Sequence, residues 1–308
     1  MSSELTLQDL NERLSHIEDQ FNALQETVSR ISATLGQWPS QLERPEPIAY
    51  SLAREQSAAL YTERFHCLLD AGEACIRYTA ALALALMSNA SDRAALLGAL
   101  GGQPVALGKW AALVDRSLVL LQGSQPDTAV DVWQSLLESL VRPNGKRTPA
   151  ARFMLVELVQ VRNTEKGHGS AKTEGVYEGL YYRHASALHD ALRDLTFLRF
   201  PMVCIEDIDV AGECTRYAVR VLMNPYPIGR IEGVLSGSRV RKGETCIWDR
   251  AQGLLSLGGL VIYQTCPECQ LEHTFFLEQA TSDRTRYSSY AGNHRFQGAP
   301  LGWASQSV

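Results

Sequence analysis

A permanent cation and a titratable imidazole stand close together in the segment RNTEKGHG. Arg162 and Asn163 follow the apolar stretch AARFMLVELVQV, and His168 lies between Gly167 and Gly169. Six residues turn through about 600° on a straight helix, so Arg162 and His168 cannot share one helical face. The glycines predict that the helix ends here and that the chain folds His168 back toward Arg162. Such a pair suits phosphodiester chemistry, in which the arginine stabilises a charged phosphorane and the histidine moves a proton.

The same residues also have a purely structural interpretation. An Arg-Asn pair at a helix C-terminus is an ordinary solvated end that the helix dipole stabilises. A Gly-His-Gly segment can be nothing more than a turn.

A second group of candidate ligands centres on Cys266 and Cys269, which form a C-x2-C knuckle. Tetrahedral zinc needs four ligands. No second knuckle follows, but His294 stands where one is expected, and Cys246 or His273 could complete the set. The sequence therefore predicts a structural zinc site in a zinc-ribbon-like domain, with a metal-free remnant as the alternative. Redox chemistry is disfavoured, because β-like residues flank this knuckle, whereas a thioredoxin-like C-x2-C opens a helix.

The elements that must hold Arg162 belong to a predicted helical bundle at residues 51–200. Its spine is one long apolar helix, EQSAALYTERFHCLLDAGEACIRYTAALALALM. Short connections between helices predict an up-and-down arrangement. Asp127 and Thr148 precede two of the helices as N-caps. The later helices are expected at 107–121, 128–141, 148–161 and 175–198.

After Phe200 and Pro201 the hydrophobic period changes from 3.6 to 2, which predicts short strands. The runs are MVCIEDIDV, RYAVRVLM, RIEGVLSG, TCIWD, LVIYQTC and HTFFLEQ. They predict a small antiparallel β domain at residues 201–297, which carries the C-x2-C knuckle, and a flexible tail at 298–308. The expected fold class is α+β and mainly α.

The N-terminal residues 1–36 show an unbroken heptad pattern, and residues 37–50, with three prolines, read as a linker. Such a narrow apolar stripe predicts a dimerising coiled coil; the alternative is that the stripe packs on the protein's own body. The apolar positions are Leu7, Leu10, Leu14, Ile17, Phe21, Leu24, Val28, Ile31 and Leu35.

The overall charge excludes some classes of protein. The formal net charge is −5, so no global positive field exists to package nucleic acid. A local basic region occurs in the β segment, where it could guide an RNA backbone. Nearby acidic residues make an ordinary solvated surface the equal alternative. The basic residues are Arg216, Arg220, Arg230, Arg239, Arg241, Lys242 and Arg250.

Cysteine usage and hydropathy bear on the cellular setting. Seven cysteines with a single close pair argue against a disulfide framework and for a reducing cytoplasm. The longest apolar run, Tyr78 to Met87, is half of what a bilayer span needs, so no membrane association is expected. Walker, dinucleotide-binding, nucleophile-elbow and HExxH motifs are absent from the sequence.

The motif R-N-x4-H at the end of an apolar helix, followed by a closing helix, resembles the R-x(4–6)-H motif of HEPN domains. The resemblance covers roughly residues 51–200 and implies a four- or five-helix bundle. Many members are metal-independent endoribonucleases whose two protomers bring both Arg/His pairs to one cleft. Carried over, Arg162 would stabilise the scissile phosphate, His168 would act as general acid and base, and Asn163 would orient either side chain.

The resemblance implies a homodimeric endoribonuclease, of a prokaryotic toxin or antiviral defence system, that needs no cofactor for catalysis. RNA would be its substrate, and an antitoxin or a defence-system protein its partner. The alternative is a non-catalytic HEPN-like module that binds RNA, a nucleotide or a partner protein within a larger complex.

Overall fold

The computed structural model describes residues 44–126, 128–167, 172–211, 214–226, 229–236, 239–299 and 301 of the 308. The predicted coiled coil, the predicted cap Asp127 and the candidate general base His168 lie outside these residues. No helix in the described part of the chain is long and apolar enough to cross a membrane.

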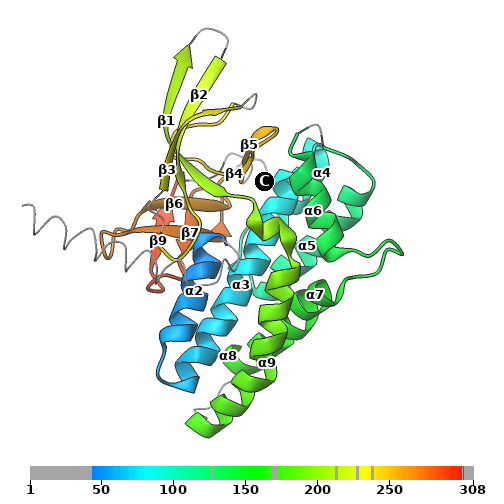
Figure 1. Ribbon diagram of the computed structural model, residues 1–308, viewed down its shortest axis with the longest axis vertical. Helices are drawn as coiled ribbons and strands as arrows, with labels where there is room; N and C mark the ends of the chain where they lie inside the picture. Colours follow the sequence, from blue (N-terminus) through cyan, green and yellow to red (C-terminus); the bar gives the residue numbers. More distant parts are fainter. Residues whose placement is uncertain are drawn as a thin grey trace, which may run out of the picture. The chain divides into compact units, whose positions relative to one another are not determined.

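The fold is α+β, with a helical region followed by two antiparallel sheets (Figure 1). The helices are α2 (Glu46–Ser57), α3 (Tyr61–Ala85), α4 (Ala90–Gly98), α5 (Leu107–Gln122), α6 (Val130–Leu140), α7 (Pro149–Arg152), α8 (Leu158–Gly167) and α9 (Glu174–Asp194). A π-helical turn, Phe153–Glu157, joins α7 to α8, and a 3-10 turn, Thr196–Arg199, follows α9.

Helix α3 is the centre of the helical region. It packs against α2, α5 and α9 and also contacts α8. Its second half, CIRYTAALALA, is rich in alanine and leucine, which favour helix and allow close approach on all sides. Nearly every residue from Phe65 to Leu84 is buried, as expected for a helix that is enclosed by its neighbours.

The strands of the described residues form two antiparallel sheets. The five-stranded sheet has the order β3-β2-β1-β4-β5, and the four-stranded sheet has the order β6-β7-β8-β9. Their bounds are β1 (Met202–Ala211), β2 (Cys214–Val221), β3 (Gly229–Leu235), β4 (Thr245–Asp249), β5 (Gly253–Ser256), β6 (Val261–Thr265), β7 (Glu272–Ala280), β8 (Thr285–Ser288) and β9 (Arg295–Gly298).

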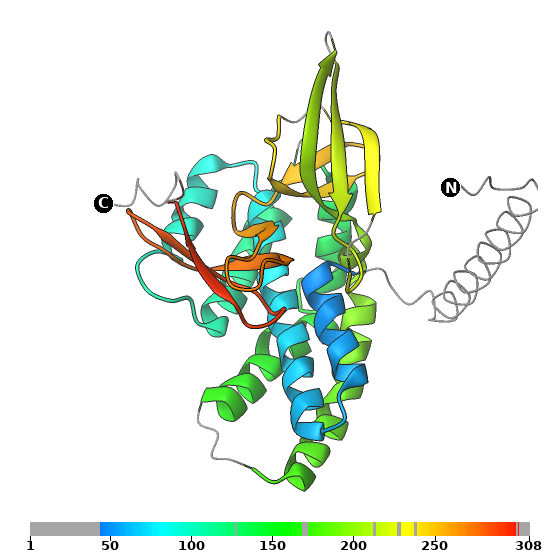
Figure 2. The ribbon, with the colours of Figure 1, turned by 90° about the vertical axis from the view of Figure 1, so that its left-hand side faces the viewer.

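The four-stranded sheet shares its core with the helices. Phe275, Phe276 and Leu277 of β7 are buried in the same apolar cluster as α3 and α5. The segment between α4 and α5 also pairs with β7, because the Val105 amide donates to the Glu278 carbonyl at 2.8 Å. Figure 2 shows this sheet, in orange and red, beside the helices. The β strands that carry the knuckle are therefore anchored on the helical region.

Two boundaries differ from the sequence prediction. Residues 46–50, assigned to the linker, are the first turn of α2, where Pro47 occupies a position that tolerates proline. The long spine helix is broken between Ser57 and Tyr61 although no glycine or proline lies there. Glu174 of α9 provides the reason, because its carboxylate accepts hydrogen bonds from the Tyr61 and Thr62 amides and so caps the start of α3.

The β region forms two sheets rather than one, and three of its strands had no sequence signal. Strands β5, β8 and β9 have four residues each, too few to show an alternating pattern. Other predictions are confirmed: TCIWD is β4, and the Thr148 hydroxyl caps α7 by accepting from the Ala151 amide at 3.1 Å.

Two buried glutamates of α2 predict opposite pH effects. Burial raises the pKa of Glu46 from 4.5 to about 7, although Thr274 next to it lowers the value. The stability from its neutral form is complete below pH 4.5 and is lost as the pH rises through 7. We expect Glu46→Gln to match the wild type at pH 4 and to exceed it at pH 8, by on the order of 3 kcal/mol, in urea unfolding.

Glu55 of the same helix is the matched control. Burial raises its pKa, but the hydrogen bonds from His189 and Tyr181 outweigh this and lower the pKa overall. Its charged form therefore contributes stability above the unfolded pKa. Glu55→Gln should lose stability at pH 8 and lose less as the pH falls. The same pH trend in both variants would contradict the assignment.

Candidate functional site

Arg162 lies on α8 and is held by a buried carboxylate of α3. Its Nε donates to Oε1 of Glu73 at 2.9 Å. The Glu73 side chain is only 4% exposed, whereas that of Arg162 is 29% exposed. A guanidinium carries five N–H donors, so one bond through Nε fixes its orientation without using its donor capacity. Arg162 is therefore an oriented cation that is partly open to solvent.

Glu73 belongs to a row of polar residues on the largely apolar helix α3. His66, Asp70, Glu73 and Arg77 recur at spacings of four, three and four, which places them on one face. The His66 ring lies edge-on to Tyr177 of α9, with ring centroids 5.6 Å apart. Sequence reasoning missed this row, although the charged residues within the apolar segment LLDAGEACIRY are a signal for it.

Arg77 extends this row to the four-stranded sheet. Its Nη1 donates to the Ser288 hydroxyl at 3.3 Å, and its guanidinium lies over the Tyr290 ring, 5.6 Å from the centroid. Burial raises the pKa of Tyr290, nearby Arg77 lowers it, and Glu73, Asp70 and Arg162 contribute smaller effects. The ring of Tyr290 is thus in contact with the polar row of α3 through Arg77.

Of the other two residues of the predicted catalytic motif, the structure describes Asn163 but not His168. Asn163 is exposed on α8, and the described part of α8 runs to Gly167, so the helix end that the glycines predict stays a prediction. His168 lies outside the described residues, so its approach to Arg162 stays a prediction. Lys172, the next described residue, forms an ion pair with Glu165 of α8.

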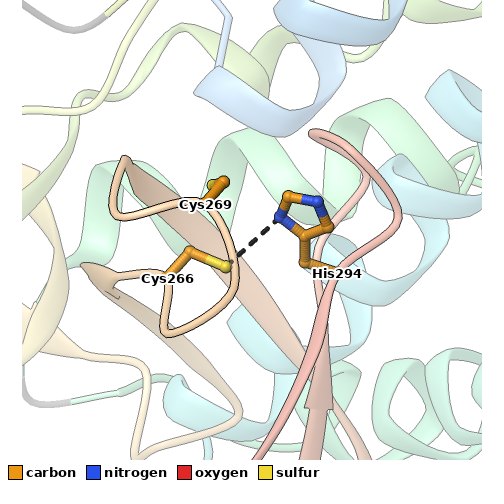
Figure 3. A group of neighbouring side chains, drawn as sticks. All are labelled: Cys266, Cys269 and His294. Atoms are coloured by element: carbon orange, nitrogen blue, oxygen red, sulfur yellow. Dashed lines mark hydrogen bonds between the residues drawn. The ribbon is translucent and has the colours of Figure 1, made fainter.

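Cys266, Cys269 and His294 come together although 28 residues separate the first from the last. Their ligand atoms all lie within 4.8 Å of one another, and the Cys266 Sγ is 3.2 Å from the His294 Nδ1 (Figure 3). Zinc bonds of about 2.3 Å to sulfur and 2.0–2.1 Å to nitrogen at a tetrahedral angle place S and N roughly 3.6 Å apart. The cluster has the composition and nearly the spacing to hold a metal ion.

The backbone of the knuckle is folded to present sulfur. The Cys266 amide donates to the Leu271 carbonyl at 2.7 Å, and the Gln270 amide donates to the Cys266 carbonyl at 2.9 Å. Gln270 has a φ of 62°, which reverses the chain after Cys269. The Glu268 amide points at the Cys266 Sγ, 3.4 Å away.

Of the two proposed fourth ligands, the structure brings only His273 near. Its Nε2 is 3.2 Å from the Cys269 Sγ. Burial lowers the pKa of His273, and the neighbouring His294 lowers it further, which favours the neutral imidazole that metals require. Cys246 was the wrong alternative, because it is buried in the separate core of the five-stranded sheet with Val203 and Ile205.

The basic residues of the β segment are partly neutralised. Arg220 contacts Glu206 at 2.5 Å and Glu272 at 2.7 Å, and Arg230 contacts Glu206 and Glu232. Lys242 lies 3.7 Å from Asp207. These pairs favour the solvated-surface interpretation over an RNA-guiding strip.

Comparisons with known proteins add no relative: no family model matches the chain, and no curated protein or solved structure is significantly similar to it. The resemblance to HEPN domains therefore remains a prediction from the motif.

The ion pair between α3 and α8 leads to a prediction about stability. Glu73→Gln keeps the size of the side chain but removes the charge that Arg162 faces. Losing a buried bond to a charged group should cost about 1.5–3 kcal/mol in urea unfolding at pH 7.

Glu63→Gln on the same helix serves as the control. Glu63 contacts Arg54 at 3.0 Å, but these side chains are 48% and 40% exposed. Such surface pairs contribute roughly 0–1 kcal/mol. Equal losses in the two variants would show that the Glu73–Arg162 pair contributes no more than a surface contact.

Proposed function

We propose that the protein is a homodimeric, metal-independent endoribonuclease of the HEPN type, acting as a prokaryotic toxin or defence effector. The observation that carries the proposal is the oriented, partly exposed Arg162 beside buried Glu73. It lies on α8, five residues before Gly167, and the sequence continues directly from Gly167 into His168. The R-N-x4-H motif supplies the reaction class.

In the proposed reaction, the 2′-oxygen of a ribose attacks the adjacent phosphorus. A P–O2′ bond forms and the P–O5′ bond breaks, which leaves a cyclic phosphate and a 5′-hydroxyl. Arg162 donates hydrogen bonds to the phosphorane, whose negative charge is largest in the transition state. His168 accepts the 2′-hydroxyl proton and delivers a proton to the departing 5′-oxygen.

The buried carboxylate beside Arg162 supports this assignment. Glu73 fixes the guanidinium before substrate arrives, and preorganised donors stabilise developing charge without reorganisation. Asn163, exposed on the same helix, would orient the phosphate or the imidazole. Dimerisation through the heptad arm and the helical region would place two such sites together.

We further propose that Cys266, Cys269 and His294 bind a structural zinc ion, with His273 as the fourth ligand. The donor set fits zinc, because thiolate and imidazole are its usual structural ligands. Both cysteine–histidine pairs lie at 3.2 Å. The ion would join the turn between β6 and β7 to the loop between β8 and β9 and would take no part in the cleavage of RNA.

The ribonuclease proposal predicts separate effects of two substitutions. His168→Ala should lower the cleavage rate by about 10²–10⁴, the usual contribution of a positioned acid or base. Arg162→Lys should lower it by about 10²–10³, because an ammonium lacks the planar fork that grips two phosphate oxygens. Cleavage of total RNA by the zinc-loaded protein, in buffer without added divalent ions, measures both.

Arg152→Lys provides a matched control, since Arg152 lies on the same helical segment with its side chain 74% exposed. Its cleavage rate should equal that of the wild type. RNA that stays intact with several wild-type preparations, or equal growth inhibition by the wild type and His168→Ala in cells, would favour the non-catalytic interaction module.

The metal proposal predicts about one zinc per chain by elemental analysis. Cys269→Ser should lose the metal and lower the thermal midpoint, whereas Cys67→Ala should keep it, since Cys67 is buried in α3. A metal-free wild type, after reconstitution with zinc under reducing conditions, would contradict the proposal.

A further inference from the structure

The loop between β8 and β9 has one side toward the candidate metal centre and one side toward the helices. The Ser289 amide donates to the His294 carbonyl at 2.9 Å, which closes the loop on itself. The Ser289 hydroxyl accepts from the Ala291 amide at 3.1 Å. Gly292 and Asn293 then turn the chain with positive φ angles of 79° and 58°.

The metal side of the loop leaves little free space. A Cβ atom at Gly292 would lie 2.9 Å from the ring of His294, so glycine is needed for the ring to fold back over the turn. This position brings the His294 Nδ1 to the Cys266 Sγ. The Arg295 amide also donates to Oε1 of Glu268, inside the knuckle, at 3.0 Å. The loop is thus joined to the knuckle by two contacts, one through the His294 ring and one through the Arg295 amide.

Tyr290 lies on the side of the loop that faces the helices. Its ring packs edge-on against Phe276 of β7, with centroids 5.7 Å apart, and lies beneath the guanidinium of Arg77. Arg77 is buried, and its Nη1 donates to Ser288, the last residue of β8. The buried guanidinium of Arg77 is therefore in contact both with β8 and with the loop that follows it.

Arg77 lies one helical turn from Glu73 on the same face of α3. Glu73 in turn orients Arg162. The contact of Tyr290 with Arg77 and the contact of Glu73 with Arg162 therefore meet on one face of α3, one helical turn apart, between the loop that carries His294 and the residue proposed to bind the scissile phosphate. Coupling between sites is carried by such packed and hydrogen-bonded contacts.

We propose that the metal centre controls the Arg162 site: a tetrahedral, thiophilic divalent ion fixes the loop between β8 and β9, which holds Arg77 and Glu73 in register with α8. This inference rests on the proposed zinc site and ribonuclease function. The ion takes no part in the chemistry. Its release frees His294, loosens the contact of Tyr290 with Arg77, and lets the orientation of Arg162 vary.

Hydrogen–deuterium exchange of the full-length protein, with zinc and after its removal by a chelator, tests the coupling without relying on activity. Removal of zinc should speed exchange in peptides covering 266–273 and 288–296. It should also speed exchange in 158–167, by about 5- to 150-fold, the range of typical coupling energies. Peptides from α5, at 107–122, should not change.

Arg77→Leu breaks the proposed path while it fills the same buried space. In this variant, zinc removal should still affect 288–296 but no longer affect 158–167. Tyr290→Phe, which keeps the ring, and Ser288→Ala serve as milder variants should Arg77→Leu fold poorly. Arg54→Leu on α2 is the control and should respond as the wild type does.

The outcomes separate the proposals. Zinc binding with exchange changes confined to 266–296 in the wild type would overturn the coupling and leave the metal site standing. A chain that binds no zinc would overturn the metal site itself. Coupling that persists while RNA stays intact would overturn only the ribonuclease proposal.

Discussion

The carboxylate of Glu73 sits on a helix that is enclosed by its neighbours, and this arrangement imposes a requirement on the surrounding structure. A buried charge is costly unless a counter-charge and hydrogen bonds satisfy it. Arg162 on α8 supplies both the counter-charge and the hydrogen bond. Glu73 therefore obtains its partner when α8 packs on α3. The orientation of the arginine is thereby determined by the core of the protein rather than by its surface.

The same requirement explains how the helical and sheet regions meet. Arg77 is a second charge on the same face of α3, and its contacts come from Ser288 and Tyr290 rather than from a carboxylate. An aromatic face and a hydroxyl are weaker partners than an ion pair. They hold the guanidinium only where the sheet is packed closely, which ties the placement of β8 to that of α3.

Features set by neighbouring residues could be predicted from the sequence, whereas contacts between residues far apart in the chain could not. Local signals located α5, β4 and the cap at Thr148, because periodicity and capping are properties of neighbouring residues. The knuckle indicated Cys266 and Cys269 with His294, since ligand chemistry limits the choice of partners. The pairing of Glu73 with Arg162, 89 residues apart, has no local signature. The break before Tyr61 is likewise set by Glu174, more than 100 residues away.

The π-helical turn at Phe153–Glu157 decides which residue of α8 meets α3. Such a turn accommodates one residue more than an α-helix of the same length would. Each residue advances the helix by about 100°, so a regular helix of this sequence running from Thr148 would rotate the segment after Glu157 by that angle. Arg162 would then be turned by about 100° from its position beside Glu73. The wide turn therefore sets the rotation of α8 about its axis, so the direction in which the arginine points is determined by a segment about two turns before it in the sequence.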